Sequence, residues 1–308
     1  MVDYKIIIDW LQFTLLRDDG LTTMLNILKL NPSDFEQLDK GGLGYRDQLY
    51  NNNVRVYYNG NTGMGINASI SGKGCRYMES QGIDLWTLLF RLARSARINI
   101  TRLDLALDTD AKLIDKVKAK IDKKEYISKS RSLSYICKSG KNSTRTETIY
   151  IGSRSSDLMI RLYDKAVEQS LDGIDWERWE IVLKKEKIKE AIPLLKKDIS
   201  QTFKNILYTY FRPLVRVESN KSRSKVCNWY LKFLGKVEKI SLYKEPTEKT
   251  IEDKWAWVEK QVAPTLALLS LAFDNTEFLA GVAVGSVDRI KQKDLKLIER
   301  YKERWLWI

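Results

Sequence analysis

Apolar and polar residues alternate along short stretches through most of the chain, a pattern typical of β-strands with one buried face. Residues 41–74 are also rich in Gly and Asn, and Asn59-Gly60 is a hairpin turn signal because both residue types tolerate positive φ. We therefore expect an antiparallel meander there. The other predicted strands cover residues 4–14, 99–108, 132–138, 147–152, 157–165 and 176–184.

Apolar residues at spacings of three and four predict helices between and after these strands. The predicted helices cover residues 22–30, 84–97, 112–125, 185–211 with a break at Pro193, 251–274 and 290–305. Strands and helices do not alternate as they would in parallel βαβ units. The predicted fold class is therefore α+β, an antiparallel sheet with helices packed on one face, followed by a small C-terminal helical region.

The polar stretch Lys236–Lys249 contains Pro246 and predicts a linker between two domains, which we place at residues 1–235 and 236–308. The chain has no run of about 18 apolar residues that would cross a membrane, and its start lacks a signal-peptide pattern. Its three cysteines are widely spaced, which suits a reducing compartment. We expect a cytoplasmic protein with no membrane partner.

The composition limits the chemistry. The chain has no histidine, which excludes Ser-His-Asp and Cys-His catalysis and every His-containing zinc site. Any metal must then bind oxygen ligands, which favours Mg²⁺ or Mn²⁺. The 53 Lys and Arg residues exceed the 40 Asp and Glu residues by 13. This excess favours a polyanionic partner, above all nucleic acid, although a solvated charged surface is the alternative.

Acidic residues share one face of two predicted strands. A period of two places Asp104 and Asp108 on the same face as Arg102, and it places Glu180 beside Arg178. Asp is disfavoured in strands, so two in one short strand need a reason. Carboxylates from neighbouring strands can hold a hard divalent cation, and Arg–carboxylate pairs across the sheet are the alternative.

A third predicted strand places Tyr163 between Arg161 and Lys165 on one face. Adjacent positive charge is expected to favour the phenolate, and the same cations could hold a phosphate next to the hydroxyl. A tyrosine that only stacks against arginine is the alternative. Basic and aromatic residues also interleave over residues 204–244, where they either contact nucleic acid or form helix core with a solvated charged side.

Several stretches, in order along the chain, resemble the Rep_trans family of rolling-circle plasmid replication initiators of Gram-positive bacteria, which is related to the relaxases of conjugative elements. The matching stretches are Asp9–Thr14, Ile70–Arg76, Arg102-Leu103-Asp104 with Asp108, Thr148–Arg154, Ile160–Lys165, Arg178-Trp179-Glu180 and Trp257–Leu266. Better-known rolling-circle enzymes bind their metal through a histidine pair. This chain has none, so the resemblance implies that carboxylates serve instead.

The resemblance implies a plasmid replication initiator that nicks one strand of supercoiled DNA at the double-strand origin. Its tyrosine would form a 5′-phosphotyrosine link, leave a 3′-hydroxyl for extension, and rejoin the strand after one round. It also implies a homodimer and recruitment of a host helicase. Residues 1–235 would then be a relaxase-like nicking domain, and residues 236–308 would bind origin DNA.

On this resemblance Tyr163 is the predicted nucleophile, and Tyr150, on the partner strand, is the fallback. The predicted metal ligands are Asp104 and Glu180, with Asp108 and Glu147 as weaker candidates for a third. The predicted DNA-binding residues are Arg161, Lys165 and Arg178. Two alternatives stay open: a relaxase that nicks the transfer origin of an integrative conjugative element, and a non-catalytic DNA-binding protein. A start directly at the first strand favours the plasmid initiator over the relaxase.

Overall fold

The computed structural model describes residues 5–16, 20–139, 145–171, 173–240, 242, 250–290 and 292–305. The chain divides into two compact units, Met1–Lys244 and Glu245–Ile308.

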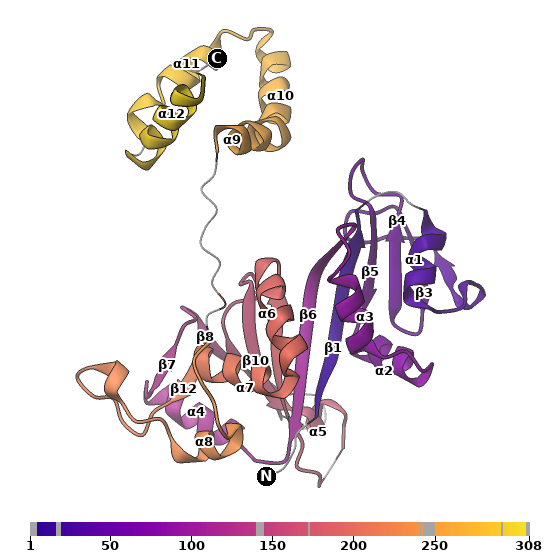
Figure 1. The fold of residues 1–308 in the computed structure, drawn as a ribbon, viewed down its shortest axis with the longest axis vertical. Helices are drawn as coiled ribbons and strands as arrows, with labels where there is room; N and C mark the ends of the chain where they lie inside the picture. The colour runs from indigo at the N-terminus through magenta and orange to yellow at the C-terminus, as the bar shows by residue number, and fades with distance from the viewer. Residues whose placement is uncertain are drawn as a thin grey trace. The chain divides into compact units, whose positions relative to one another are not determined.

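The first unit is built on one ten-stranded antiparallel sheet with the order β2-β3-β4-β5-β1-β6-β11-β10-β9-β8 (Figure 1). Its strands are β1 (Ile6–Leu15), β2 (Glu36–Leu38), β3 (Asp47–Asn51), β4 (Val54–Tyr58), β5 (Ile66–Ile70), β6 (Ile98–Thr109), β8 (Leu133–Ser139), β9 (Arg145–Ile151), β10 (Leu158–Asp164) and β11 (Glu177–Lys184). β7 (Tyr126–Ser128) and β12 (Phe211–Pro213) pair in a separate two-stranded sheet. The structure thus confirms the predicted antiparallel α+β fold.

The long strands β1 and β6 pair at the middle of the sheet and join its two halves. Ile8 pairs with Leu105, but Trp10 pairs with Asp104, so Asp9 is an extra residue in a β-bulge. Before and after the bulge, the buried apolar residues of β1 stay on the same face of the sheet.

Helices cover one face of this sheet (Figure 1). They are α1 (Leu21–Leu28), α2 (Gly72–Ser80), α3 (Leu85–Leu92), α4 (Ile114–Asp122), α6 (Glu186–Lys197), α7 (Ile199–Tyr210) and α8 (Asn228–Leu234). The short helix α5 (Lys165–Glu168) follows β10. Trp179 of β11 points to this side and is fully buried, with its ring centroid 5.9 Å from that of Phe233. Leu105 of β6 and Phe203 of α7 belong to the same apolar core. The opposite face of the central strands is therefore left for polar residues.

Two local features differ from the sequence prediction. The helix expected over residues 185–211 breaks at Asp198, which is extended and accepts a hydrogen bond from the Gln201 N–H, so it caps α7. Pro193 lies inside α6 instead of ending it. The tightest turn of the predicted meander is formed by Asn52 and Asn53, both with positive φ, while Asn59 begins a longer loop between β4 and β5.

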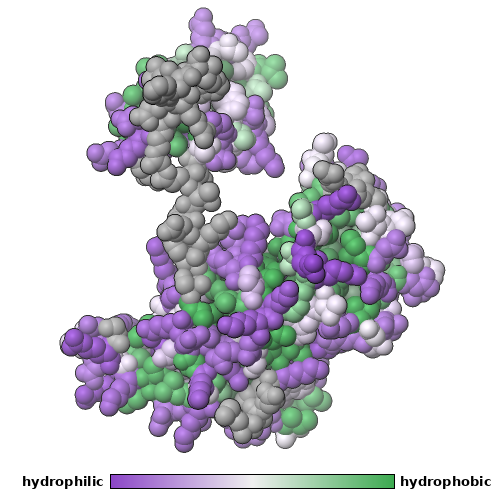
Figure 2. Space-filling view, viewed as in Figure 1, coloured by the Kyte–Doolittle hydropathy of each residue, from purple (hydrophilic) through white to green (hydrophobic). Residues whose placement is uncertain are grey.

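The second unit contains α9 (Ile251–Trp257), a π-helical turn (Val258–Val262), α10 (Ala263–Phe273), α11 (Phe278–Val284) and α12 (Gln292–Trp305). Thr250 and Asp253 form a capping box at the start of α9. No residue of this unit that the structure describes is buried, and Leu271 is 86% exposed. Hydrophobic side chains accordingly show on its surface (Figure 2). Over the described residues, no helix of either unit is long and apolar enough to span a bilayer.

Candidate active site

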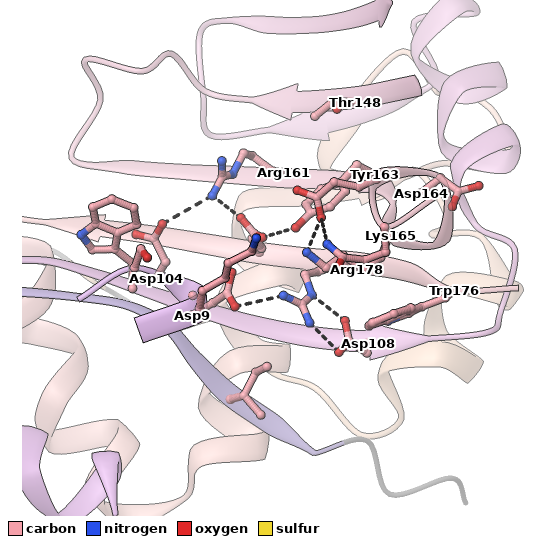
Figure 3. Close-up of a pocket in the computed structure, with 18 of the residues that line it drawn as sticks. Asp9, Asp104, Asp108, Thr148, Arg161, Tyr163, Asp164, Lys165, Trp176 and Arg178 are labelled. Carbon is pink, nitrogen blue, oxygen red and sulfur yellow. Dashed lines mark hydrogen bonds and ion pairs between the residues drawn. The ribbon is translucent and has the colours of Figure 1, made fainter. Parts of the chain in front are cut away.

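A pocket of about 1060 Å³ opens on the polar face of the sheet. Its lining comes from β1, β6, β9, β10 and β11 and from the starts of α2 and α5, so segments far apart in the sequence meet there (Figure 3). The sheet register explains the meeting, because Arg161 pairs with Glu180 and Glu180 pairs with Ala106 across three adjacent strands.

Arg161 lies between the two predicted metal ligands (Figure 3). Its Nη2 is 3.4 Å from Asp104 Oδ2 and also forms an ion pair with Glu180 Oε2. Asp104 accepts two further hydrogen bonds from Arg102, at 2.9 and 2.6 Å. Asp104 and Glu180 are each only 1% exposed, and this burial raises the pKa of each carboxyl above the ordinary value. The Arg–carboxylate pairing that the sequence left open is therefore present.

Tyr163 contacts one of these two carboxylates, that of Glu180. Its side chain lies two residues along β10 from Arg161, and its hydroxyl donates a hydrogen bond to Glu180 Oε1. Tyr163 is 9% exposed and contributes to the pocket wall. Burial and the Glu180 carboxylate raise the pKa of the phenol well above its ordinary value. The expectation that Arg161 and Lys165 favour the phenolate is therefore wrong, because burial and the Glu180 carboxylate outweigh the positive charge nearby, which comes mainly from Arg178.

The remaining predicted DNA-binding residues are differently engaged. Arg178 donates to both carboxylate oxygens of Asp108, at 2.6 and 2.7 Å, and to Asp9 at 3.0 Å, and it is 6% exposed. Lys165 Nζ pairs with Glu168 and lies 5.7 Å from the centroid of the Tyr163 ring. Arg178 thus ties β1, β6 and β11 together, and it lines the pocket along with Arg161 and Lys165.

Asp9 is a site residue to which the sequence gave no role. It projects from the bulge of β1 toward Arg178 and toward the first turn of α2 (Figure 3). A Cβ atom on Gly72 would lie 2.9 Å from Asp9 Oδ1, so glycine at this position lets the helix start approach the carboxylate. The alternation of apolar and polar residues does not identify the residue that a bulge inserts. The signal that could have identified Asp9 is its position as the first residue of the family-like stretch Asp9–Thr14.

The weaker third-ligand candidates do not join Asp104 and Glu180. Asp108 is four residues farther along β6, about 13 Å at the usual rise per residue, and it pairs with Arg178. Glu147 pairs with Lys118 at 3.0 Å. Over the described residues, no group of three or more Asp, Glu or Cys side chains is placed to hold a metal ion. The two carboxylates still suit Mg²⁺ or Mn²⁺, which often bind one or two carboxylates and complete their shell with water and substrate phosphate oxygens.

The sequence matches two family descriptions along its length. Residues 5–90 match the N-terminal domain of rolling circle replication initiation proteins, and residues 98–282 match the family described as replication initiation factor. A protein of Bacillus subtilis (strain 168) named "Putative DNA relaxase NicK" is 27% identical over 282 residues, which cover 85% of this chain and 80% of that protein.

A solved structure has the same fold. The rolling circle replication initiator protein from Geobacillus stearothermophilus superposes with a TM-score of 0.69 and 29% sequence identity, covering 75% of this chain and 96% of that one. The two matched regions span most of the sheet and include every pocket residue discussed above. The chain therefore belongs to the rolling-circle replication initiator family.

Proposed function

We propose that this chain is a DNA strand transferase that nicks one strand at a replication origin, with Tyr163 as the nucleophile. One observation carries the proposal: the Tyr163 hydroxyl is fixed by Glu180 at the wall of a pocket that Arg161 and Lys165 also line. A positioned oxygen nucleophile beside cations is the arrangement that displacement at phosphorus needs. Family membership and the relaxase-like relative support the same reaction.

In the proposed reaction the Tyr163 oxygen forms a bond to the scissile phosphorus while the bond from phosphorus to the 3′-oxygen breaks. The 5′-phosphate stays on the tyrosine as a diester, and the released 3′-oxygen takes a proton to become a hydroxyl. Because the Tyr163 phenol is protonated at neutral pH, its proton must leave as the new bond forms. Arg161 and Lys165 would hold the non-bridging phosphate oxygens, and attack by the 3′-hydroxyl on the phosphotyrosine would rejoin the strand.

We further propose that Asp104 and Glu180 hold Mg²⁺ or Mn²⁺, and that Arg161 then releases at least one of them. The cation would act as a Lewis acid on the scissile phosphate. Support comes from the donor set, two buried carboxylates that face one pocket. The homodimer, the host helicase and origin binding by residues 236–308 stay predictions of the family resemblance.

The test is a nicking assay on supercoiled origin DNA with Mg²⁺ or Mn²⁺, comparing the wild type with Tyr163→Phe. Loss of one hydroxyl should abolish the nick and the covalent protein–DNA adduct, while DNA affinity stays within about twofold, because phosphate contacts dominate binding. Tyr150→Phe is the matched control, since Tyr150 lies across from Arg161 on β9 and lines the same pocket.

Each outcome decides between named alternatives. Loss of the adduct in Tyr150→Phe but not in Tyr163→Phe would move the nucleophile to β9. DNA binding by the wild type without any nick or adduct, under either cation, would leave a non-catalytic DNA-binding protein. A plasmid double-strand origin and a conjugative transfer origin, used as parallel substrates, separate the initiator from the relaxase.

A further inference from the structure

Four basic residues from four separate segments gather in the first unit, and none of them lines the pocket. Lys129 follows β7, Lys187 lies in α6, Arg212 lies in β12, and Lys239 lies in the segment after α8. We refer to these four residues as the basic cluster.

Backbone contacts hold these segments in place. The Lys129 N–H donates to the Tyr210 carbonyl at 3.2 Å, next to the pairing of β7 with β12. The Ile240 N–H donates to Thr209 Oγ1 at 3.0 Å, which fixes the segment carrying Lys239 against α7. The positive charges are therefore brought together by folding and are not neighbours in sequence.

The basic cluster is short of counter-charge. Lys187 Nζ pairs with Glu190 at 2.7 Å, but within the described part of the chain Lys129, Arg212 and Lys239 have no carboxylate within ion-pair distance. Burial lowers the pKa of the Lys129 ammonium, and so do the positive charges of the other three members. A bound anion would relieve this repulsion.

Two tyrosines beneath the cluster already have cations over their rings. Lys129 Nζ lies 5.5 Å from the centroid of the Tyr210 ring, and Arg212 Cζ lies 5.5 Å from that of Tyr208. These contacts hold the cations in place. They also cover ring faces on which unpaired bases would otherwise stack, so the cluster offers charge without a stacking platform.

We propose that the basic cluster is a second DNA-binding site, separate from the nicking pocket, and that it binds the phosphate backbone of duplex DNA. Charge without stacking suits a duplex, whose bases are hidden and whose phosphates are presented outward. The proposal rests on the proposed function to the extent that DNA is the partner. The duplex flanking a nick site is the DNA that such a second site would hold.

The experiment measures fluorescence anisotropy of a labelled linear duplex of mixed sequence, and of labelled oligo-dT, over a range of salt concentrations. The test variant is Lys129→Gln with Lys239→Gln, since both lysines are exposed and neither leaves a carboxylate unpaired. Its matched control is Lys29→Gln with Lys40→Gln, which removes the same charge from exposed positions of the first unit.

Loss of two phosphate contacts should make the slope of log K against log salt shallower by about 1.8, from roughly 0.9 per contact. Duplex affinity should fall tenfold or more, oligo-dT affinity should change less than about twofold, and the control should match the wild type. Thermal unfolding followed by circular dichroism should be the same in all three proteins.

Unchanged duplex binding in the test variant would overturn the second site while leaving the Tyr163 experiment unaffected. An equal loss of affinity for the duplex and for oligo-dT, or an equal loss of duplex affinity in the control, would show that only the overall charge matters. Either result would also overturn the second site. If the wild type bound neither probe, the proposed function would fail, and the second site with it.

Discussion

For Tyr163, the sequence predicted the position of the side chain but not its pKa. Alternation correctly placed Arg161 and Tyr163 on one face of a strand, whereas Lys165, expected on the same strand, is the first residue of α5. The structure places all three at the pocket. The raised pKa of the phenol could not be predicted, because it depends on burial and on the carboxylate acceptor that β11 supplies from across the sheet. The pattern along one strand identified cations near Tyr163, whereas the hydrogen-bond acceptor of its hydroxyl, Glu180, lies on the neighbouring strand β11.

Arg178 illustrates the same limit for a charged residue. Its position on a polar strand face suggested DNA binding, but its guanidinium is buried and held by Asp9 and Asp108. Asp9 reaches it only because β1 bulges, and a bulge cannot be recognised in the amino-acid pattern. Removing one partner of a buried ion pair leaves the other charges without compensation.

We therefore expect Arg178→Met to lower the free energy of unfolding by about 3–5 kcal/mol, because methionine keeps the apolar stem and removes the charge. Urea denaturation measures the change. Lys184→Met, at the half-buried end of the same strand face, is the control: Lys184 donates to the Arg154 carbonyl and pairs with no carboxylate among the described residues, so the change should cost less than about 1 kcal/mol. Adding Asp108→Asn to Arg178→Met should recover part of the loss. Equal costs for the two single variants would show that the buried pairing adds no stability.

At the scale of elements, strands were predicted better than helix ends. Strand faces follow from a period of two, so the polar face of β6 and its buried leucines could be assigned directly. Helix ends depend on caps whose partners can be distant. Asp198 caps α7 locally and could have been recognised, but α4 begins where Glu177 of β11 accepts hydrogen bonds from the N–H groups of Leu113 and Ile114, at 2.6 and 3.0 Å.

The Glu177 cap predicts a pH effect on stability. Burial raises the pKa of this carboxyl in the folded state, although the two N–H groups oppose the shift. A raised folded pKa means that the folded state binds the proton more tightly, so this group's contribution to stability falls as pH rises from the ordinary Glu pKa of about 4.3 through the raised value.

Glu177→Gln removes that dependence while keeping one acceptor oxygen for α4. The stability of the wild type relative to Glu177→Gln should therefore be greatest at low pH and should shrink as pH rises through this window. Urea titrations of both proteins at a series of pH values from about 4 to 7 measure it. A relative stability that grows with pH would contradict the raised pKa.

At the scale of the whole molecule, composition and element order predicted the α+β class and a separate C-terminal part. They could not predict strand order, because the pairing of β1 with β6 joins residues about a hundred positions apart. The two units also differ in a way that the hydropathy pattern does not reveal. The first has an extensive buried core, while in the second Trp255 and Leu271 are exposed and no described residue is buried.

We expect a protein truncated after Lys244 to keep the melting temperature of the first unit, because the core of that unit is complete without residues 245–308. The isolated segment 245–308 should lack a cooperative thermal transition, since a small unit without a buried core cannot offset the entropy of ordering its chain. Circular dichroism melts of the two fragments measure this. A sharp, reversible transition of the isolated segment would contradict it.

The position of β1 at the centre of the sheet has a consequence for how the chain is made. This strand is synthesised before both of its partners, because its two hydrogen-bonding edges are satisfied by β5 and by β6, which ends at Thr109. Until β6 has been synthesised, at least one edge of this largely apolar strand has no partner in the sheet. Slow translation or loss of β6 would thus expose the nascent chain to aggregation before the pocket is assembled.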